Sequence, residues 1–93
     1  MISYTPPTAH DLQTLKNQLG YTGEQMAELV NVAGSQQWRK YTGGEQPRSL
    51  SLHQLFFMAA RMTLSTEELE RVRAQMRALG AEVSEIKKQE KKV

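Results

Sequence analysis

The sequence contains no cysteine, which excludes a disulfide framework and any metal site that depends on thiolate ligands. It also has no apolar run close to the ~20 residues that a transmembrane helix requires. The opening residues, MISYTPPTAHDL, lack the basic flank and the apolar segment of a secretory signal. We therefore expect a cytoplasmic protein.

Groups suited to catalysis or metal binding are scarce. The two histidines, His10 and His53, fall in different predicted helices without an acidic ligand cluster beside either of them. Glu67, Glu68 and Glu70 lie in a predicted first helical turn, where carboxylates favour the helix dipole and need no catalytic role. Since no nucleophile is paired with a base, we expect no enzymatic activity, metal, cofactor or small-molecule ligand.

The periodicity that is present is helical throughout, and 93 residues suffice for one small core. We predict an all-α protein of five helices without strands. A first helix follows Thr8 and ends at Gly20, and a loop containing glycine and proline spans residues 43–48. The fourth helix opens at Ser49 or Ser51. It is expected to supply the bulkiest part of the core: Leu52, Leu55, Phe56, Ala59 and Met62.

Residues 22–44, TGEQMAELVNVAGSQQWRKYTGG, form the most informative segment of the chain. Thr22 and Gln25 have the spacing of a capping box at the start of a helix. Asn31 stands where a residue in the left-handed conformation would end that helix. Ser35 is a suitable N-cap for the next one. The segment therefore predicts two short helices joined by a tight turn.

The second of these helices, over about residues 35–42, separates apolar from polar side chains. Trp38 and Tyr41 are expected in the core, whereas the positions between and before them are polar or basic: Gln36, Gln37, Arg39 and Lys40. Amide and cationic side chains can pair with base edges in the major groove of DNA. With Trp38 facing inward, Gln36 and Lys40 point away from the core and are the best candidates for reading bases. Base stacking by the two aromatic residues is the less favoured alternative.

The charge distribution favours the same segment. The net charge is only +2, but residues 35–48 carry three basic residues and one acidic residue, whereas residues 1–34 carry one basic and three acidic residues. Arg48, after the loop, is expected to contact the phosphate backbone rather than bases. A second basic cluster is either a solvated chain end or a phosphate-contacting arm. It consists of Lys87, Lys88, Lys91 and Lys92.

The pattern from Leu12 to about Leu69 resembles the lambda-repressor-like, Cro and Xre-type helix-turn-helix family. Ala27 stands at the small-residue position midway along the first motif helix, and Asn31 and Val32 occupy the turn. The family then has apolar anchors and a glycine at intervals of three residues. Trp38, Tyr41 and Gly44 keep that rhythm.

The resemblance implies a helix-turn-helix domain in residues 1–64, whose second and third helices read duplex DNA. Residues 65–93 are predicted from their own pattern to form an extended C-terminal helix with a basic tail. The family often has Gln at the start of the first motif helix to hold a phosphate, whereas this chain has Gly23 there. The backbone amides at that helix start, helped by Thr22, are therefore expected to hold the phosphate instead.

The spacing from Val32 to Trp38 is one residue longer than is usual in the family. This leaves open which of the first three residues of the recognition helix enters the groove first. Recognition helices that begin with paired Gln also occur in phage repressors of this type. The predicted DNA-contacting residues are Thr22, Ser35, Gln36, Gln37, Arg39, Lys40 and Arg48.

The predicted fifth helix begins after the Ser65–Glu68 capping box and carries an apolar stripe with coiled-coil spacing. The stripe consists of Leu69, Val72, Met76, Leu79, Val83 and Ile86. Flanking residues of opposite charge suit a parallel two-stranded coil: Glu68 with Arg73, and Glu82 with Lys87. The stripe predicts a homodimer, with packing on the protein's own helices as the alternative. Gly80 interrupts it, so residues 69–79 are its firmer half.

Together these features predict a sequence-specific, duplex DNA-binding transcriptional regulator. We expect a homodimeric repressor of a phage, plasmid or other mobile-element operon that blocks a promoter at an inverted-repeat operator. The alternative is an antitoxin or adaptor protein whose C-terminal helix binds a protein partner. Co-purification of one small partner, or monomeric behaviour alone, would favour that alternative.

Overall fold

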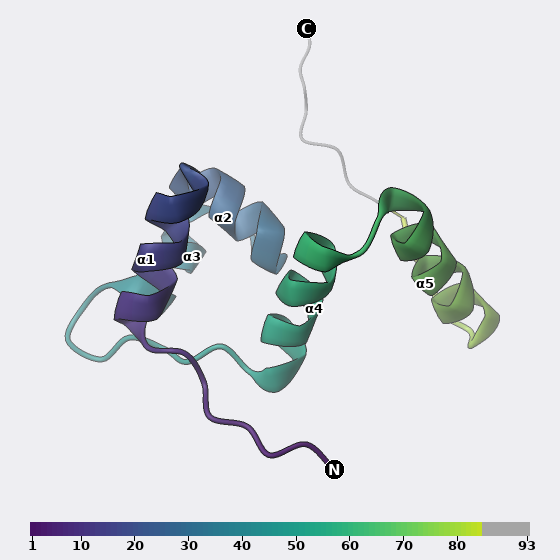
Figure 1. The fold of residues 1–93 in the computed structure, drawn as a ribbon, viewed down its shortest axis with the longest axis horizontal. Helices are drawn as coiled ribbons and strands as arrows, with labels where there is room; N and C mark the ends of the chain where they lie inside the picture. Colours follow the sequence, from purple (N-terminus) through teal and green to yellow (C-terminus); the bar gives the residue numbers. More distant parts are fainter. Residues whose placement is uncertain (85–93) are drawn as a thin grey trace, which may run out of the picture. The chain divides into compact units, whose positions relative to one another are not determined.

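The computed structural model describes residues 1–84. These residues form five α-helices and no strand, as the sequence predicts. The helices are α1 (Ala9–Leu19), α2 (Gly23–Val30), α3 (Ser35–Thr42), α4 (Leu52–Thr63) and α5 (Thr66–Ala78) (Figure 1). The chain divides into two compact units, Met1–Thr63 and a second unit that begins at Leu64. Within the described part of the chain, no helix has the length and apolar character needed to cross a membrane.

Helix starts and ends lie largely where the local sequence places them. Thr8, Thr22 and Ser65 each form a capping box, in which the residue three positions on returns a side-chain hydrogen bond to the cap. These reciprocal bonds satisfy amides that a helix start otherwise leaves unpaired. Gly20 and Asn31 end α1 and α2 in the left-handed conformation, with φ of 68° and 66°.

The core of the first unit draws on all four of its helices and on the loop before α4. Its buried residues are Leu12, Met26, Ala27, Val30, Trp38, Tyr41, Leu50 and Met58. Trp38 is only 1% exposed, and its helix α3 packs against both α1 and α2. The Tyr4 hydroxyl donates a hydrogen bond to the Leu50 carbonyl (2.8 Å), which fastens the N-terminal segment to the loop before α4.

The helix α4 turns a different face to the core than predicted. Met58 is buried, whereas Phe56 is 66% exposed and Met62 is 48% exposed. Ala59 is also exposed, and only the predicted Leu52 and Leu55 are partly buried. The prediction is wrong because α4 carries apolar residues on every side, so helical periodicity does not single out its inward face.

The helix α5 is shorter than the predicted C-terminal helix. It ends at Ala78, with Leu79 as its C-cap, and Gly80 has a φ of 108°. This backbone conformation is easily adopted only by glycine. Val83 lies beyond the end of the helix, so the prediction of a continuous seam past Leu79 is wrong. Ile86 and the basic cluster at positions 87–92 lie outside the described residues.

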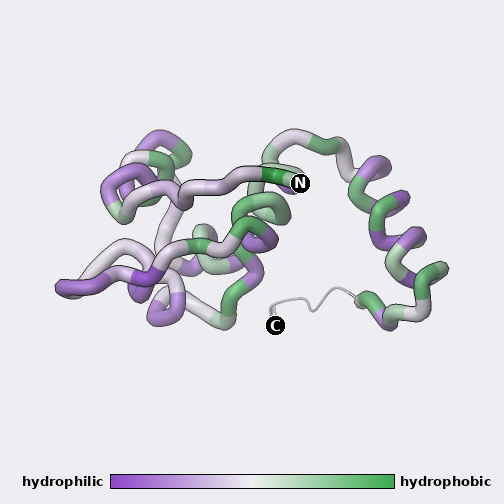
Figure 2. The backbone as a smooth tube through the Cα atoms, turned by 90° about the horizontal axis from the view of Figure 1, so that it is seen from below, coloured by the Kyte–Doolittle hydropathy of each residue, from purple (hydrophilic) through white to green (hydrophobic). Residues whose placement is uncertain are grey.

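The part of the predicted stripe that α5 does carry is short but regular. Hydrophobic and hydrophilic residues alternate along α5 (Figure 2). Leu69 is partly buried, whereas Val72 is 48% exposed, Met76 42% and the C-cap Leu79 78%. None of the residues of α5 is fully buried.

Candidate functional site

The helices α2 and α3 approach each other closely at their N-terminal ends. A Cβ atom added to Gly23 would lie 3.1 Å from the Cβ atom of Ser35 and 4.0 Å from Cδ1 of Trp38. The first of these distances is shorter than ordinary carbon contacts, so any residue with a Cβ atom at position 23 would require Ser35 to shift by a few tenths of an ångström. Gly23 therefore suits the close approach of α3 to α2.

The connection between α2 and α3 is a tight turn over residues 31–34. The Val32 amide donates a hydrogen bond to the Ala27 carbonyl (2.9 Å), and the Val32 side chain packs against the core. The Asn31 amide donates to the Glu28 carbonyl at 3.2 Å. Arg61, from the last turn of α4, also donates to the Glu28 carbonyl. These bonds satisfy carbonyls at the end of α2 and hold the turn in place.

The start of α3 differs from the prediction that Ser35 is its N-cap. Gly34 is the N-cap and has no side chain to offer, and Ser35 is the first residue of the helix. The Ser35 amide instead donates a hydrogen bond to Oε2 of Glu24, 3.2 Å away on α2. The cap is therefore supplied by a residue from another helix, which a search for local capping motifs does not find.

The short helix α3 separates its side chains into a buried and an outward face. Trp38 and Tyr41 are buried, at 1% and 8% exposed. Gln36, Arg39 and Lys40 are exposed, while Ser35 and Gln37 are partly buried. Five of the predicted contact residues thus lie on one eight-residue helix that is anchored by its aromatic side chains.

Arg48 is brought beside this helix by the backbone. Its amide donates a hydrogen bond to the Lys40 carbonyl with a separation of 2.7 Å, and the Arg48 side chain is exposed. Thr22 is also exposed, at the start of α2, and its hydroxyl oxygen accepts from the Gln25 amide. That hydroxyl retains its own proton for donation to a ligand.

An open groove borders the starts of α2 and α3. Its lining includes Gln13 and Lys16 from α1, the N-cap Thr22 and Glu24 at the start of α2, and Arg39 from α3. Sequence reasoning missed Gln13, Lys16 and Glu24 as members of the site. No local pattern marks them, because the packing of α1 against α3 brings Gln13 and Lys16 there and the packing of α2 against α3 brings Glu24.

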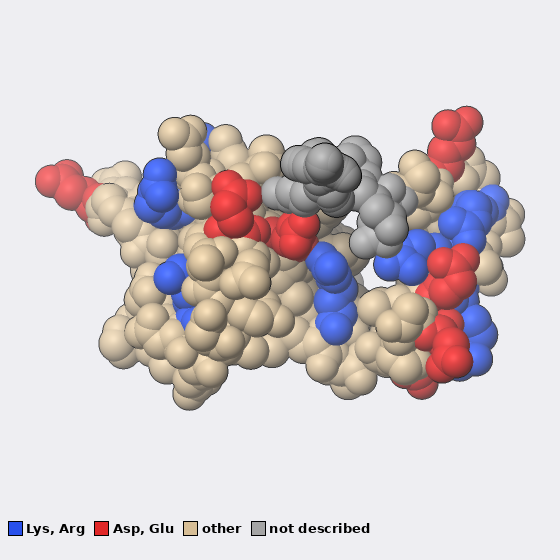
Figure 3. Space-filling model, turned by 90° about the horizontal axis from the view of Figure 1, so that it is seen from above, with Lys and Arg blue, Asp and Glu red and all other residues tan. Residues whose placement is uncertain are grey.

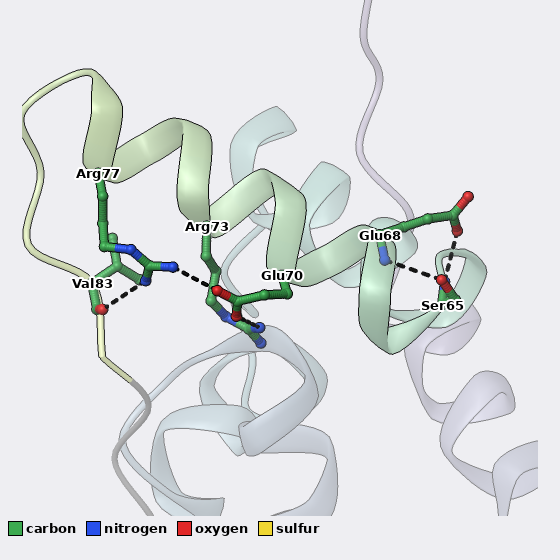
Figure 4. Close-up of polar contacts among 6 residues, drawn as sticks. All are labelled: Ser65, Glu68, Glu70, Arg73, Arg77 and Val83. Atoms are coloured by element: carbon green, nitrogen blue, oxygen red, sulfur yellow. Dashed lines mark hydrogen bonds and ion pairs between the residues drawn. The ribbon is translucent and has the colours of Figure 1, made fainter.

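The second unit has a different charge pattern from the first. On the face shown in Figure 3, the first unit carries a few separated charges, whereas α5 carries many charges of both signs. Glu70 pairs with Arg73 (3.3 Å) and with Arg77 (2.5 Å), and Arg77 also donates to the Val83 carbonyl (3.2 Å) (Figure 4). The hydrogen bond from Arg77, helped by Arg73, lowers the pKa of Glu70 below its ordinary value of 4.5.

One of the two charge pairs predicted between α5 helices, Glu68 with Arg73, is already engaged within a single helix, and Lys87 of the other pair lies outside the described residues. Glu68 completes the capping box with Ser65, and Arg73 bonds to Glu70 (Figure 4). Three apolar positions of the stripe, Val72, Met76 and Leu79, remain exposed beside them. Any association through α5 would therefore depend on those apolar residues more than on the predicted charge pairs.

Metal-binding groups do not gather in the described residues. Across residues 1–84, no three or more histidine, aspartate or glutamate side chains lie close enough together to hold an ion. Comparison of the chain with protein-family models, with curated proteins and with solved structures gave no match.

Proposed function

We propose that this protein is a sequence-specific, duplex DNA-binding transcriptional regulator of the lambda-repressor-like helix-turn-helix type. The observation that carries the proposal is the division of α3 between a buried aromatic face and an exposed face of amides and cations. A short helix of this kind, held by a preceding helix and a tight turn, suits insertion into a major groove. In this proposal α3 is the recognition helix.

The residues of α3 that point away from the core are the ones that contact base edges in this proposal. Gln36 and Lys40 are both exposed and lie roughly opposite Trp38 on the helix. A Gln side chain can pair with adenine through two hydrogen bonds, and Lys can donate to O6 and N7 of guanine. The guanidinium group of Arg39 can donate hydrogen bonds either to guanine or to phosphate oxygens.

Phosphate contacts frame the recognition helix. Arg48 is tied by its backbone to the end of α3, and Lys16 and Arg39 line the groove beside the start of α2. The amides at a helix start and nearby cations are suited to phosphate oxygens. These contacts would fix the orientation of α3 on the duplex without reading its sequence.

We further propose a homodimeric repressor of a phage, plasmid or other mobile-element operon that acts by blocking a promoter. The exposed stripe of α5 supports dimerisation, since Val72 and Met76 are each more than two-fifths exposed at 48% and 42%. Two recognition helices would then enter successive major grooves, with half-sites ~34 Å apart or a multiple of that distance.

Selection of bound sequences from a random duplex library tests this function. We expect enrichment of one inverted repeat by the wild-type protein, and loss of that enrichment by Gln36→Ala with Lys40→Ala. A variant at an exposed polar position away from α3, Gln75→Ala, is the matched control. Failure of the wild-type protein to enrich any duplex, or preference for single strands, would reject the proposal.

A second candidate function rests on the same exposed stripe. If α5 serves another protein, the chain is an antitoxin or adaptor and its own dimer is absent. Purification with a single small partner, together with a monomeric state of the chain alone, would favour this function over the homodimeric repressor.

A further inference from the structure

We propose that Glu24 is a positioning residue that holds the start of the recognition helix in register for base reading and weakens general phosphate binding. This inference rests on the proposed DNA-binding function and assigns a role to a residue outside the predicted contact set. It starts from the hydrogen bond between Oε2 of Glu24 and the Ser35 amide, at 3.2 Å.

Glu24 stands at the starts of two helices at once. It lies in the first turn of α2, and its carboxylate reaches the first residue of α3. Both helix starts carry partial positive charge from their amides, so one carboxylate stabilises both. Because the N-cap Gly34 makes no side-chain hydrogen bond, Glu24 supplies the acceptor that the start of α3 otherwise lacks.

The position of this bond relates it to base reading. Gln36 and Gln37 follow Ser35 directly, and Glu24 lines a shallow groove together with all three of them. A shift of the first turn of α3 would move both Gln side chains. Hydrogen bonds to base edges would be lost after such a shift, because they require exact positions of the two Gln side chains. Contacts to the repeating phosphate backbone would tolerate the shift.

The charge of Glu24 has a separate effect. Glu24 also lines the groove that contains Lys16 and Arg39, the cations proposed to meet phosphates. A negative group there repels a phosphate of any duplex, regardless of sequence. The hydrogen bond therefore affects selectivity, and the charge affects affinity for all duplexes equally.

Two substitutions separate these effects. Glu24→Gln keeps an oxygen acceptor for the Ser35 amide but removes the charge, whereas Glu24→Ala removes both. Glu28→Gln and Glu28→Ala are matched controls, because Glu28 is an exposed glutamate one turn further along the same helix. Circular dichroism checks that each variant remains folded.

The first measurement needs no DNA. In wild-type protein and in Glu24→Gln, we expect the Ser35 amide to exchange with solvent at similar rates. In Glu24→Ala, loss of the cap should accelerate its exchange by about tenfold. Equal exchange in Glu24→Ala and wild type would overturn the positioning role.

The second measurement compares dissociation constants for the duplex selected by the wild-type protein and for a mixed-sequence duplex. Both Glu24 variants should bind the mixed duplex about fivefold more tightly at low salt, because a nearby like charge is gone. Selectivity is the dissociation constant for the mixed-sequence duplex divided by that for the selected duplex. Only Glu24→Ala should also lower this ratio, by about tenfold. An unchanged ratio in Glu24→Ala, or the same loss in Glu24→Gln or Glu28→Ala, would overturn the inference.

Failure of the proposed function gives a different result. If the wild-type protein selects no duplex, the proposed DNA-binding function and the role of Glu24 in selectivity are both rejected, whatever the amide exchange shows. If it selects a duplex and the Glu24 variants behave like the Glu28 variants, only the role of Glu24 falls.

Discussion

The side-chain amide of Gln54 donates a hydrogen bond to the hydroxyl of Tyr41, with 3.1 Å between the two atoms. Tyr41 is a buried residue of α3, and Gln54 lies in the first turn of α4. The same Gln54 side chain accepts a bond from the Ser51 amide at 2.8 Å, and the Ser51 hydroxyl accepts from the Gln54 amide. The Gln54 side chain therefore caps the start of α4 and also connects this helix to Tyr41, in the second half of α3.

Removing the Tyr41 hydroxyl should weaken the fold without altering the exposed face of α3. Tyr41→Phe keeps the buried ring but loses the bond to Gln54, which we expect to cost about 1 kcal/mol in the free energy of unfolding. Urea denaturation followed by circular dichroism measures the change. Tyr21→Phe, at an exposed tyrosine, is the control. An unchanged midpoint in Tyr41→Phe would show that this bond adds nothing to stability.

Stability and recognition should separate along α3. Trp38→Ala removes a side chain that is 1% exposed, which should cost roughly 3–5 kcal/mol and unfold so small a protein. Gln36→Ala and Lys40→Ala should leave the thermal midpoint nearly unchanged while each costs roughly 1–3 kcal/mol of binding to the selected duplex. Thermal unfolding and duplex titration measure the two quantities separately. A folded Trp38→Ala protein that has lost only nucleic-acid binding would instead favour base stacking by Trp38.

Arg48 should matter to every duplex alike. If its side chain holds a phosphate, Arg48→Ala weakens binding to selected and mixed sequences by similar factors and lowers the salt slope by about one unit. Arg71→Ala, which removes the same charge from the exposed surface of α5, should change neither quantity appreciably. Loss of preference at a single base pair with an unchanged salt slope would place Arg48 in a groove.

Acid should weaken α5 through Glu70. The pKa of Glu70 is lowered in the folded state by Arg77 and Arg73, so its contribution to stability is present above the ordinary value of 4.5 and is lost as the pH falls through the lowered value. Wild-type α5 should therefore have a higher helix content than Glu70→Gln at about pH 6, and the difference should vanish at about pH 2. Because these side chains are exposed, the effect should be small and should shrink with added salt.

Backbone chemical shifts of α5 across this pH range measure the effect, with Glu67→Gln as a control for loss of a carboxylate elsewhere on the helix. A difference between wild type and Glu70→Gln that stays constant with pH would show that the Arg77 contact does not stabilise α5.

Local rules account for much of this fold. Thr8, Thr22 and Ser65 are capping residues with partners three positions on, and a short polar motif of this kind depends little on the rest of the chain. The buried positions of α3 were also predicted, because Trp38 and Tyr41 stand in an otherwise polar helix. Where one face of a helix is clearly apolar, helical periodicity is enough to predict which of its residues are buried.

The wrong predictions for the buried face of α4 and the N-cap of α3 both concern contacts between residues on different helices. Phe56 and Phe57 are adjacent in a helix with apolar residues all round, and only the packed neighbours decide that Met58 faces inward. The carboxylate of Glu24 caps a helix that begins eleven residues later, a relationship with no sequence pattern. Long-range choices of this kind need the tertiary structure, and they determine the exact composition of the candidate site.

The exposed apolar stripe of α5 should join two copies of the chain. Val72 and Met76 lie one turn apart on an exposed apolar stripe, at 48% and 42% exposed. Burial of both against a second copy would remove apolar surface from water, which drives association. The helix has only 13 residues, so this contact is short and each of the two side chains should be essential to it.

Val72→Glu combined with Met76→Glu should therefore convert a dimer into a folded monomer, as measured by sedimentation equilibrium. Ala74 lies on the opposite side of the helix from both residues, so Ala74→Glu should leave the dimer intact. The monomer should retain weak binding to a single half-site but lose most affinity for the inverted repeat, because the second contact is no longer intramolecular. A wild-type monomer, or a dimer that survives both glutamates, would show that this stripe does not join two copies of the chain.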